Sequence, residues 1–173
     1  FIQTSESTNA NAAILYINEL VAIDGVTSGT LTTANTGNWT LGSSGDDTLP
    51  GTTADNRLDG SSGNDILTGN EGADTLIGGA GNDTASYTAD QNGVSVNLME
   101  GWAIDGTGDQ DVLAEIETVN GSNHGDTLVG SWFNDSFDAY DGNDWVDGLA
   151  GADTISGNLG SDTLIGGFGN DVI

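Results

Sequence analysis

The sequence predicts an all-β protein in which short parallel strands stack into a solenoid, and three observations support this fold class. Residues of the same chemistry recur every nine positions over more than half of the chain. Glycine, with 28 of 173 residues, recurs at the start of these units, where it favours turns. One apolar residue near the end of each unit can form a core only if successive units stack on one another.

Eleven units of the repeat fall into two arrays. The first array, residues 42–86, reads GSSGDDTLP, GTTADNRLD, GSSGNDILT, GNEGADTLI and GGAGNDTAS. The second array, residues 121–173, reads GSNHGDTLV, GSWFNDSFD, AYDGNDWVD, GLAGADTIS, GNLGSDTLI and GGFGNDVI. Only the ninth residue of the last unit is missing. A pattern kept over this many units predicts a repeat architecture.

Four columns of the repeat have a physical reason. The first and fourth positions are mostly glycine, which permits positive φ and close backbone packing, so these positions mark a turn. The sixth position is aspartate in every unit but one, where Asn56 replaces it. The eighth position is apolar throughout, from Leu49 to Ile173. In a three-residue strand its side chain points inward while its two neighbours point outward.

The charge of the chain requires a counter-charge from outside. There are 27 acidic residues against one basic residue, Arg57, giving a formal net charge of -26. Such a composition ordinarily predicts disorder, and metal cations are the simplest source of neutralisation. The same charge excludes nucleic acid and anionic lipid surfaces as partners. There is no cysteine for a thiolate site, and no apolar run reaches the roughly 18 residues of a membrane helix.

The turns are predicted to bind calcium. A glycine turn leaves carbonyl oxygens beside the aspartate at the sixth position, and calcium takes six to eight oxygen ligands of both kinds. The predicted metal-site residues are the aspartates Asp47, Asp65, Asp74, Asp83, Asp126, Asp135, Asp144, Asp153, Asp162 and Asp171, and the turn glycines Gly45, Gly60, Gly63, Gly69, Gly72, Gly78, Gly81, Gly142, Gly148, Gly151, Gly157, Gly160, Gly166 and Gly169. Solvated turn aspartates are the alternative, but turn preference does not explain a fixed period of nine.

The units resemble the RTX (repeats-in-toxin) nonapeptide G-G-x-G-x-D-x-U-x of the haemolysin type, and GGAGNDTAS and GGFGNDVI fit it most closely. The resemblance implies a right-handed parallel β-roll, or β-solenoid, with two nonapeptides per coil and calcium between turns of successive coils. It also implies which residues share an edge: Asp47, Asp65 and Asp83; Asn56 and Asp74; Asp126, Asp144 and Asp162; and Asp135, Asp153 and Asp171.

Three units depart from the pattern. Unit 51–59 lacks both the fourth-position glycine and the aspartate, and His124 and Phe133 replace glycine in the first two units of the second array. Those turns are expected to hold no ion or to hold it in altered geometry. Calcium is therefore assigned most firmly to Asp65, Asp74, Asp83, Asp144, Asp153, Asp162 and Asp171.

Residues outside the arrays are expected to extend or cap the solenoid. Residues 87–120 break the register but resemble segments found between RTX arrays, and the alternation from Val94 to Leu98 predicts a strand, so we expect wider coils. Asp105, Asp109 and Asp111 could bind another ion or form a polar loop. Residues 1–41 carry no repeat, and Asn9 to Ile23 fit a helix or a strand. We expect the end of a preceding domain or an N-terminal cap, in a fragment of a longer protein.

Catalysis is not expected, because there is no lysine or cysteine and the one histidine, His124, occupies a turn position. The leading hypothesis is a calcium-binding structural module of a secreted or cell-surface bacterial protein, such as a surface-layer protein or adhesin. The resemblance implies export by a type I system. The alternative is an accessory module of a type I-secreted protease, lipase or polysaccharide-modifying enzyme. The expected partners are calcium ions, with self-association or cell-surface polysaccharide as further candidates; a tryptophan platform for sugar would use Trp39, Trp102, Trp132 and Trp145.

Overall fold

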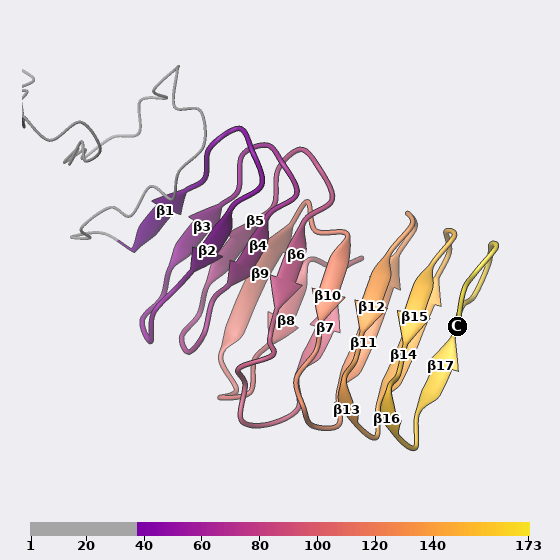
Figure 1. Ribbon diagram of the computed structural model, residues 1–173. Coiled ribbons are helices and arrows are strands. Elements are labelled where there is room, and N and C mark those ends of the chain that lie inside the picture. The colour runs from indigo at the N-terminus through magenta and orange to yellow at the C-terminus, as the bar shows by residue number, and fades with distance from the viewer. Residues whose placement is uncertain (1–37) are drawn as a thin grey trace, which may run out of the picture.

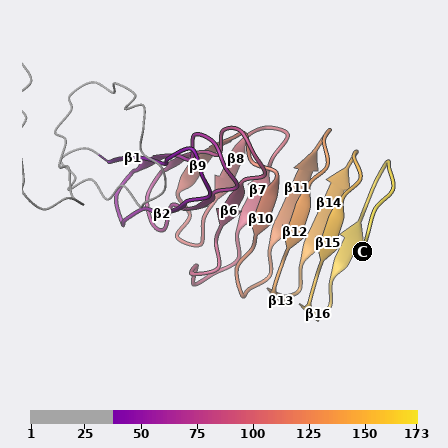
Figure 2. The ribbon, with the colours of Figure 1, turned by 45° about the horizontal axis from the view of Figure 1, so that its top comes forward.

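The computed structural model describes residues 38–173, and their regular structure consists of strands without a helix. The strands lie side by side in a stack that begins at β1 and reaches β17 beside the C-terminus (Figures 1 and 2). No helix in this range could cross a membrane. The segment Asn9 to Ile23, expected to be a helix or a strand, lies outside the described residues, as does most of the expected cap.

Two sheets form the walls of the stack. Sheet A has nine strands in the order β1-β3-β5-β9-β8-β7-β11-β14-β17, and sheet B has six in the order β15-β12-β10-β6-β4-β2. The strands of sheet A are β1 (Trp39–Leu41), β3 (Arg57–Asp59), β5 (Thr75–Ile77), β7 (Ser95–Asn97), β8 (Trp102–Ile104), β9 (Gln110–Ala114), β11 (Thr127–Ser131), β14 (Trp145–Leu149) and β17 (Thr163–Ile165).

Sheet B contains the intervening strands, and a short third pair lies apart from both sheets. The strands of sheet B are β2 (Thr48–Pro50), β4 (Ile66–Thr68), β6 (Thr84–Ser86), β10 (Thr118–Asn120), β12 (Ser136–Asp138) and β15 (Thr154–Ser156). The third pair is β13 (Asp141–Gly142) with β16 (Leu159–Gly160).

One coil of the stack consists of two nonapeptides. The last three residues of each unit form a strand, and successive strands alternate between the two sheets, because the glycine-rich turn reverses the chain each time. Strands that pair in the regular arrays are therefore 18 residues apart and parallel: Leu49 lies beside Leu67, and Leu58 beside Leu76. The expectation of a parallel β-roll with two nonapeptides per coil is confirmed.

The core is a ladder of the eighth-position side chains between the sheets. Most strands bury their central residue and leave its neighbours more exposed, as in β4, where Leu67 is 0% exposed and Ile66 is 41% exposed. The ladder continues with Leu49, Leu58, Leu76, Ala85, Leu128, Phe137, Val146 and Ile155. In the last coil Leu164 is half-buried and Ile173 is exposed, so the inward column stops there.

The segment between the arrays departs from the expected wider coils. The strand predicted around Val96 is present as β7, but β7, β8 and β9 form an antiparallel meander inside sheet A. Short loops join these strands, and loops of that length can connect only antiparallel neighbours. In sheet B, β6 pairs directly with β10, and Val119 of β10 lies between Ala85 and Phe137. The insert thus interrupts one wall of the stack and leaves the other continuous.

The first coil also begins earlier than expected. β1 pairs with β3 in the same parallel register as the later strands, with Trp39 beside Arg57. The Arg57 guanidinium lies 5.2 Å from the centre of the Trp39 ring, a distance at which a cation and an aromatic face attract. Residues before Gly42 are therefore part of the roll.

Replacing Leu67 by alanine should destabilise the calcium-saturated protein by about 2–5 kcal/mol, because it leaves a cavity in the middle of the ladder. The matched control is Ile66→Ala, one residue away on the solvent side of the same strand, which should cost much less. Denaturant unfolding of both variants in saturating calcium measures the difference. Equal losses for the two variants would contradict the ladder.

Candidate calcium sites

The sixth-position aspartates lie just before the strands, at the two edges of the stack, and their side chains point into it. Seven of the ten are buried, with Asp65 and Asp83 0% exposed. Strand pairing brings the aspartates of successive coils together on each edge. A row of buried carboxylates without basic partners is unusual, because burying a charge costs free energy unless something pairs with it.

In most of these aspartates, one carboxylate oxygen accepts a hydrogen bond from the backbone of the preceding coil. The N–H of Asp47 donates to Oδ1 of Asp65, and the N–H of Asp65 donates to Oδ1 of Asp83, both at 2.8 Å. The same bond spans 18 residues at Asn56–Asp74, Asp126–Asp144, Asp135–Asp153, Asp144–Asp162 and Asp153–Asp171, at 2.7–3.1 Å. These bonds place the predicted residues on the edges that the RTX resemblance implies.

The other oxygen, Oδ2, has no partner in five of these residues although it is fully buried. The five are Asp65, Asp74, Asp83, Asp144 and Asp153. A buried carboxylate oxygen without a hydrogen bond carries a desolvation penalty of about 1–3 kcal/mol or more. These oxygens therefore mark places where the fold needs a positive group.

In four of these five units the opening glycine borders the oxygen, and at Gly60, Gly78 and Gly148 a carbonyl of the next coil lies beside it. The unit of Asp144 opens with Ala139 instead. A methyl group built on Gly60 would contact Oδ2 of Asp65 and lie 2.6 Å from the carbonyl oxygen of Gly78. At Gly148 it would contact Asp153 and lie 2.7 Å from the carbonyl oxygen of Gly166. The first-position glycine therefore keeps open a space lined with oxygen atoms. Asp162 and Asp171 place Oδ2 beside Gly157 and Gly166 in the same way.

These oxygens suit calcium. Among residues 38–173, no three side chains of His, Cys, Asp or Glu converge, so further ligands for a cation must come from the backbone. Calcium accepts such mixtures of carboxylate and carbonyl oxygen, whereas zinc favours nitrogen and sulfur ligands. The residues present therefore fit calcium.

The role of the glycines differs in part from the prediction. Positive φ occurs at the fourth position, for example at Gly63 and Gly151, but not at the first-position glycines. It occurs instead at the second position, where Ser61 has a φ of 75° and Leu149 a φ of 67°. The first-position glycine leaves space beside the carboxylate, although Ala139 opens one unit, and the fourth-position glycine has positive φ in six units.

Four turns differ from the others, and they are the first two of each array. In them the second-position hydroxyl residue binds the sixth-position side chain of its own unit: the N–H and Oγ of Ser43 donate to Oδ2 of Asp47, at 2.5 and 2.9 Å. Ser131 makes the same pair of bonds to Asp135. The hydroxyl also accepts the N–H of the fourth-position residue, Gly45 or Phe133. We call these closed turns.

The other two closed turns belong to units 51–59 and 121–129. Thr52 donates to the side-chain oxygen of Asn56, and Ser122 donates to both oxygens of Asp126. His124 follows the pattern of Phe133, with its N–H bound to the hydroxyl of Ser122. Hydroxyl and amide donors thus satisfy Asp47, Asp126 and Asp135, whereas Asp65, Asp74, Asp83, Asp144, Asp153, Asp162 and Asp171 lie in turns without such a donor, which we call open turns.

A second ladder of side-chain bonds was not predicted. The fifth-position residue accepts a backbone N–H from the unit 18 residues later, as Asp46 accepts from Asn64 and Asn64 from Asn82, at 2.8 and 2.9 Å. Asn134 and Asn143 do the same in the second array. The frequent Asn or Asp before the sixth-position aspartate was the available signal. This ladder runs opposite to the inner one, so each coil is bound to both neighbours.

The acids of the insert do not converge on one site. Oδ1 of Asp105 accepts the backbone N–H groups of Thr107, Gly108 and Asp109, which is the arrangement of a self-contained loop. Asp111 lies elsewhere, where it accepts the N–H of Asp74 at 2.9 Å and the hydroxyl of Tyr87 at 3.2 Å. Asp111 therefore takes the place of a sixth-position aspartate.

Burial shifts the ionisation of these carboxyl groups. Together with the negative charges of neighbouring aspartates, it raises the pKa of Asp74 to about 6 and that of Asp111 to about 7. Burial also raises the pKa of Asp135 to about 6, although the hydrogen bonds from Ser131 lower it. Each shift means that the metal-free fold disfavours the charged form.

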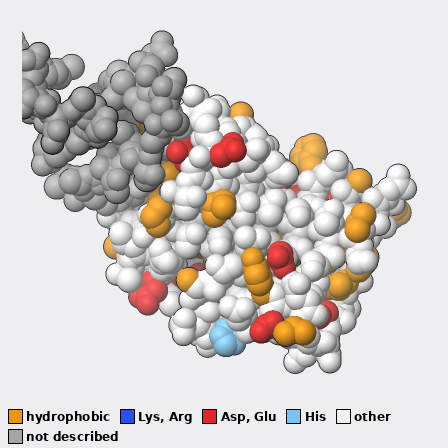
Figure 3. Space-filling view, viewed as in Figure 1, with side chains coloured by type: hydrophobic (Ala, Val, Ile, Leu, Met, Phe, Trp, Pro, Cys, Tyr) orange, Lys and Arg blue, Asp and Glu red, His pale blue; other side chains and the backbone are white. Residues whose placement is uncertain are grey.

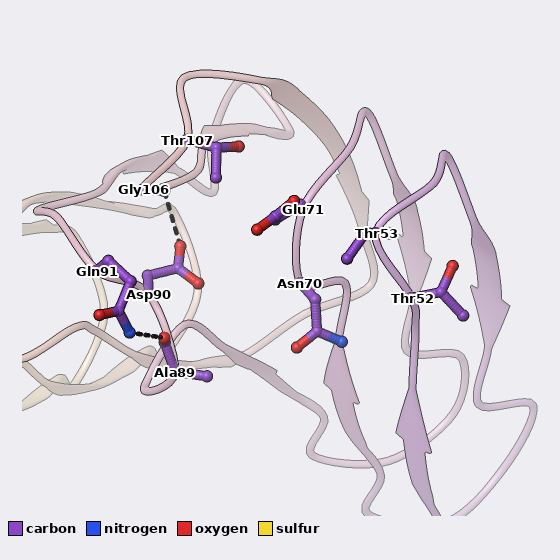
Figure 4. Close-up of a pocket in the computed structure, with 9 residues that line it drawn as sticks. All are labelled: Thr52, Thr53, Asn70, Glu71, Ala89, Asp90, Gln91, Gly106 and Thr107. Atoms are coloured by element: carbon purple, nitrogen blue, oxygen red, sulfur yellow. Dashed lines mark hydrogen bonds between the residues drawn. The ribbon is translucent and has the colours of Figure 1, made fainter.

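A groove of about 480 Å³ lies between the first array and the insert. Figure 4 shows Thr52, Thr53, Asn70 and Glu71 on one side and the insert loops on the other. Oδ2 of Asp90 accepts the N–H of Gly106 at 2.7 Å, which ties the two insert loops together. The residues that line this groove include no histidine, lysine or cysteine, and they form no arrangement typical of a catalytic site.

The tryptophans do not form one platform. Trp39, Trp102 and Trp145 lie on β1, β8 and β14 of sheet A, separated by intervening strands, and Trp132 lies in a turn. Strands in a sheet are about 4.8 Å apart, so these rings are spaced well beyond contact. On the face shown in Figure 3, apolar side chains lie singly among polar atoms.

Parallel coils whose turns bury carboxylates beside backbone carbonyls define a β-roll suited to cations. The family model of the RTX calcium-binding nonapeptide repeat matches the sequence in four copies, at residues 41–68, 50–85, 120–155 and 138–173. The chain belongs to this family, because these copies cover more than half of its length. The expected resemblance is thus confirmed.

Comparison with whole proteins adds less. No curated protein sequence matches the chain. Among the solved structures that resemble it is the extracellular lipase LipA from Serratia marcescens, with a TM-score of 0.41 and 18% sequence identity. The match covers 76% of this chain and 29% of the lipase, so the chain spans less than a third of that protein.

The raised pKa values predict how the metal-free fold depends on pH. Folded pKa values of about 6–7 for Asp74, Asp135 and Asp111 exceed the unfolded value of about 3.9. The folded chain therefore binds more protons, and this contribution to stability is fully present below about pH 4 and lost as the pH rises through about 6–7. Circular dichroism in chelator should show more strand at pH 4 than at pH 7.5.

Calcium should reverse this dependence, because the ligand carboxylates must be deprotonated to bind it. With calcium the strand signal should be strong at pH 7.5 and the calcium requirement should increase towards pH 5. A metal-free spectrum that does not change between pH 4 and pH 7.5 would contradict the assigned burial of these carboxyl groups.

Proposed function

We propose that the chain is a structural module of a secreted or cell-surface protein and that calcium in its open turns allows it to fold. The observation that carries this proposal is the row of buried Oδ2 atoms without a partner. The calcium ligands would be the carboxylates of the seven open turns together with backbone carbonyls of adjacent turns. The closed turns use hydroxyl and amide donors in place of an ion.

The energetics support a fold that depends on calcium. Two carboxylates about 4 Å apart repel by ~4 kcal/mol at an effective dielectric constant of 20. Several such pairs along each edge would exceed the ~5–15 kcal/mol net stability of an ordinary domain. Arg57 is the one basic residue of the chain and pairs with Asp59 at 3.4 Å, away from the carboxylate rows. Calcium binding and folding are then one coupled process.

Calcium availability supports an extracellular location for the module. Calcium sites in extracellular modules typically have Kd values of about 10⁻⁴–10⁻³ M. A chain with such sites stays unfolded where calcium is scarce and folds where it is abundant, which suits an exported protein. Membership of the RTX family supports export. We place the module in a surface-layer protein or adhesin, because its near-complete lack of lysine and arginine suits a surface that carries bound calcium.

Calcium should convert the chain from a largely unfolded state into a strand-rich one. Far-UV circular dichroism at pH 7.5 should show little strand in chelator and a strong strand signal in millimolar calcium. Magnesium is the control, because it demands near-ideal octahedral geometry and keeps its water ligands. A strand-rich spectrum that is the same in chelator and in calcium would sink the proposal.

The assignment of ions to open turns has its own matched pair of variants. Asp65→Asn removes a carboxylate from an open turn, and Asp47→Asn removes one from the closed turn next to it on the same edge. The calcium midpoint of folding should rise by about tenfold or more for Asp65→Asn, on the scale seen when metal sites lose supporting groups. Asp47→Asn should shift it far less. Equal shifts would show that the two kinds of turn do not differ in calcium binding.

A further inference from the structure

One edge of the stack keeps its row of acids across the insert. On the sheet B edge, the N–H of Asp83 donates to Oε2 of Glu117 at 2.9 Å, in the place where an aspartate of the next coil would accept it. Glu117 directly precedes β10, as each sixth-position aspartate precedes its strand. Glu117 lies nine residues before Asp126, the spacing of the repeat. The five residues that precede it, 112–116, contain no glycine.

The turn that carries Glu117 is shorter than a nonapeptide turn. Only Glu115, Ile116 and Glu117 separate β9 from β10, where a regular unit has six residues. Glu115 has a φ of 56°, in the left-handed region, and its carbonyl oxygen lies against Gly78. In regular coils the carbonyl of the next opening glycine occupies this place, as Gly78 does over Gly60. The short turn therefore presents the same two groups, a carbonyl and a carboxylate.

Asp83, which faces Glu117, lies in an open turn. Oδ2 of Asp83 is buried and has no hydrogen-bond partner. Glutamate is one methylene longer than aspartate, which compensates for a turn that lacks three residues. The hydrogen bond from the N–H of Asp83 to Glu117 brings the two residues together. Burial, and then the negative charge of Asp83, raise the pKa of Glu117.

We infer that Glu117 and Asp83, with the carbonyl of Glu115, form an additional calcium site that joins the two arrays. The inference rests on the proposed function, because it requires calcium in the neighbouring open turns. It assigns a ligand role to a residue outside every nonapeptide of the sequence.

The other edge provides a contrast. There Asp111 takes the place of the sixth-position aspartate next to Asp74, but its second oxygen accepts the hydroxyl of Tyr87. Beyond Asp111 the antiparallel strands β8 and β7 interrupt the row. On the sheet B edge the row continues, because the N–H of Ser136 donates to the carbonyl of Glu117 at 2.9 Å and the charge of Glu117 raises the pKa of Asp135. Only this edge links the arrays through acids alone.

The test compares Glu117→Gln with Glu100→Gln. Both remove one negative charge from the insert, but Glu100 is exposed and lies outside the site, whereas Glu117 is partly buried. The Glu117→Gln variant retains a side-chain oxygen that can accept the N–H of Asp83, so the backbone contact can survive the substitution. Native mass spectrometry of the 173-residue chain in calcium counts the bound ions, and circular dichroism shows whether each variant is folded. Glu117→Gln should bind one ion fewer than wild type, and Glu100→Gln the same number.

Other outcomes separate the two proposals. If both variants bind as many ions as wild type, the inference fails and the proposed function stands. If both lose one ion, the effect is one of general charge and the inference also fails. If the wild type binds no calcium and its spectrum does not change, the proposed function fails and takes the inference with it. Should Glu117→Gln not fold, anomalous diffraction from wild-type crystals grown in calcium decides, since a peak is expected between Asp83 and Glu117 and its absence overturns the inference.

Discussion

The need to neutralise buried carboxylates governs this fold. In the open turns, the backbone of the preceding coil donates a hydrogen bond to one oxygen of each aspartate. In five of these turns the other oxygen is fully buried without a hydrogen-bond partner, in four of them beside the opening glycine. The core ladder, the strand register and the spacing of the turns all position this oxygen, yet none of them provides its partner. In the metal-free chain, packing therefore stabilises the fold and the buried charge destabilises it.

Two solutions to this problem occur in the same molecule. Units 42–50 and 60–68 both begin with GSSG, but Ser43 closes its turn on Asp47, whereas Ser61 adopts a positive φ and leaves Asp65 open. What differs is the position in the stack. The closed turns are those with no regular nonapeptide turn before them on their edge. A hydroxyl and an N–H group replace the cation where a regular pair of turns is not available.

The sequence predicted the features that depend on residues within one unit and missed those that depend on how units stack. The period of nine predicted the coil and the column from Leu49 to Leu164 predicted the core, because each depends on one residue per unit. The antiparallel meander was not predicted, because alternation at Val94 and Val96 indicates a strand but not its direction. Glu117 was missed since its unit has neither the glycines nor the aspartate of the repeat. The serine-closed turns depend on stacking order, which no single unit encodes.

The burial of the carboxylates also changes what other molecules encounter. The net charge of -26 describes an extended polyanion with its acids in water. In the roll, nine acidic side chains are inside, at Asp65, Asp74, Asp83, Asp105, Asp111, Asp126, Asp135, Asp144 and Asp153. Long-range repulsion, which keeps highly charged chains apart, is correspondingly weaker once cations occupy that interior. The same polypeptide therefore repels itself less strongly after it folds around cations than before.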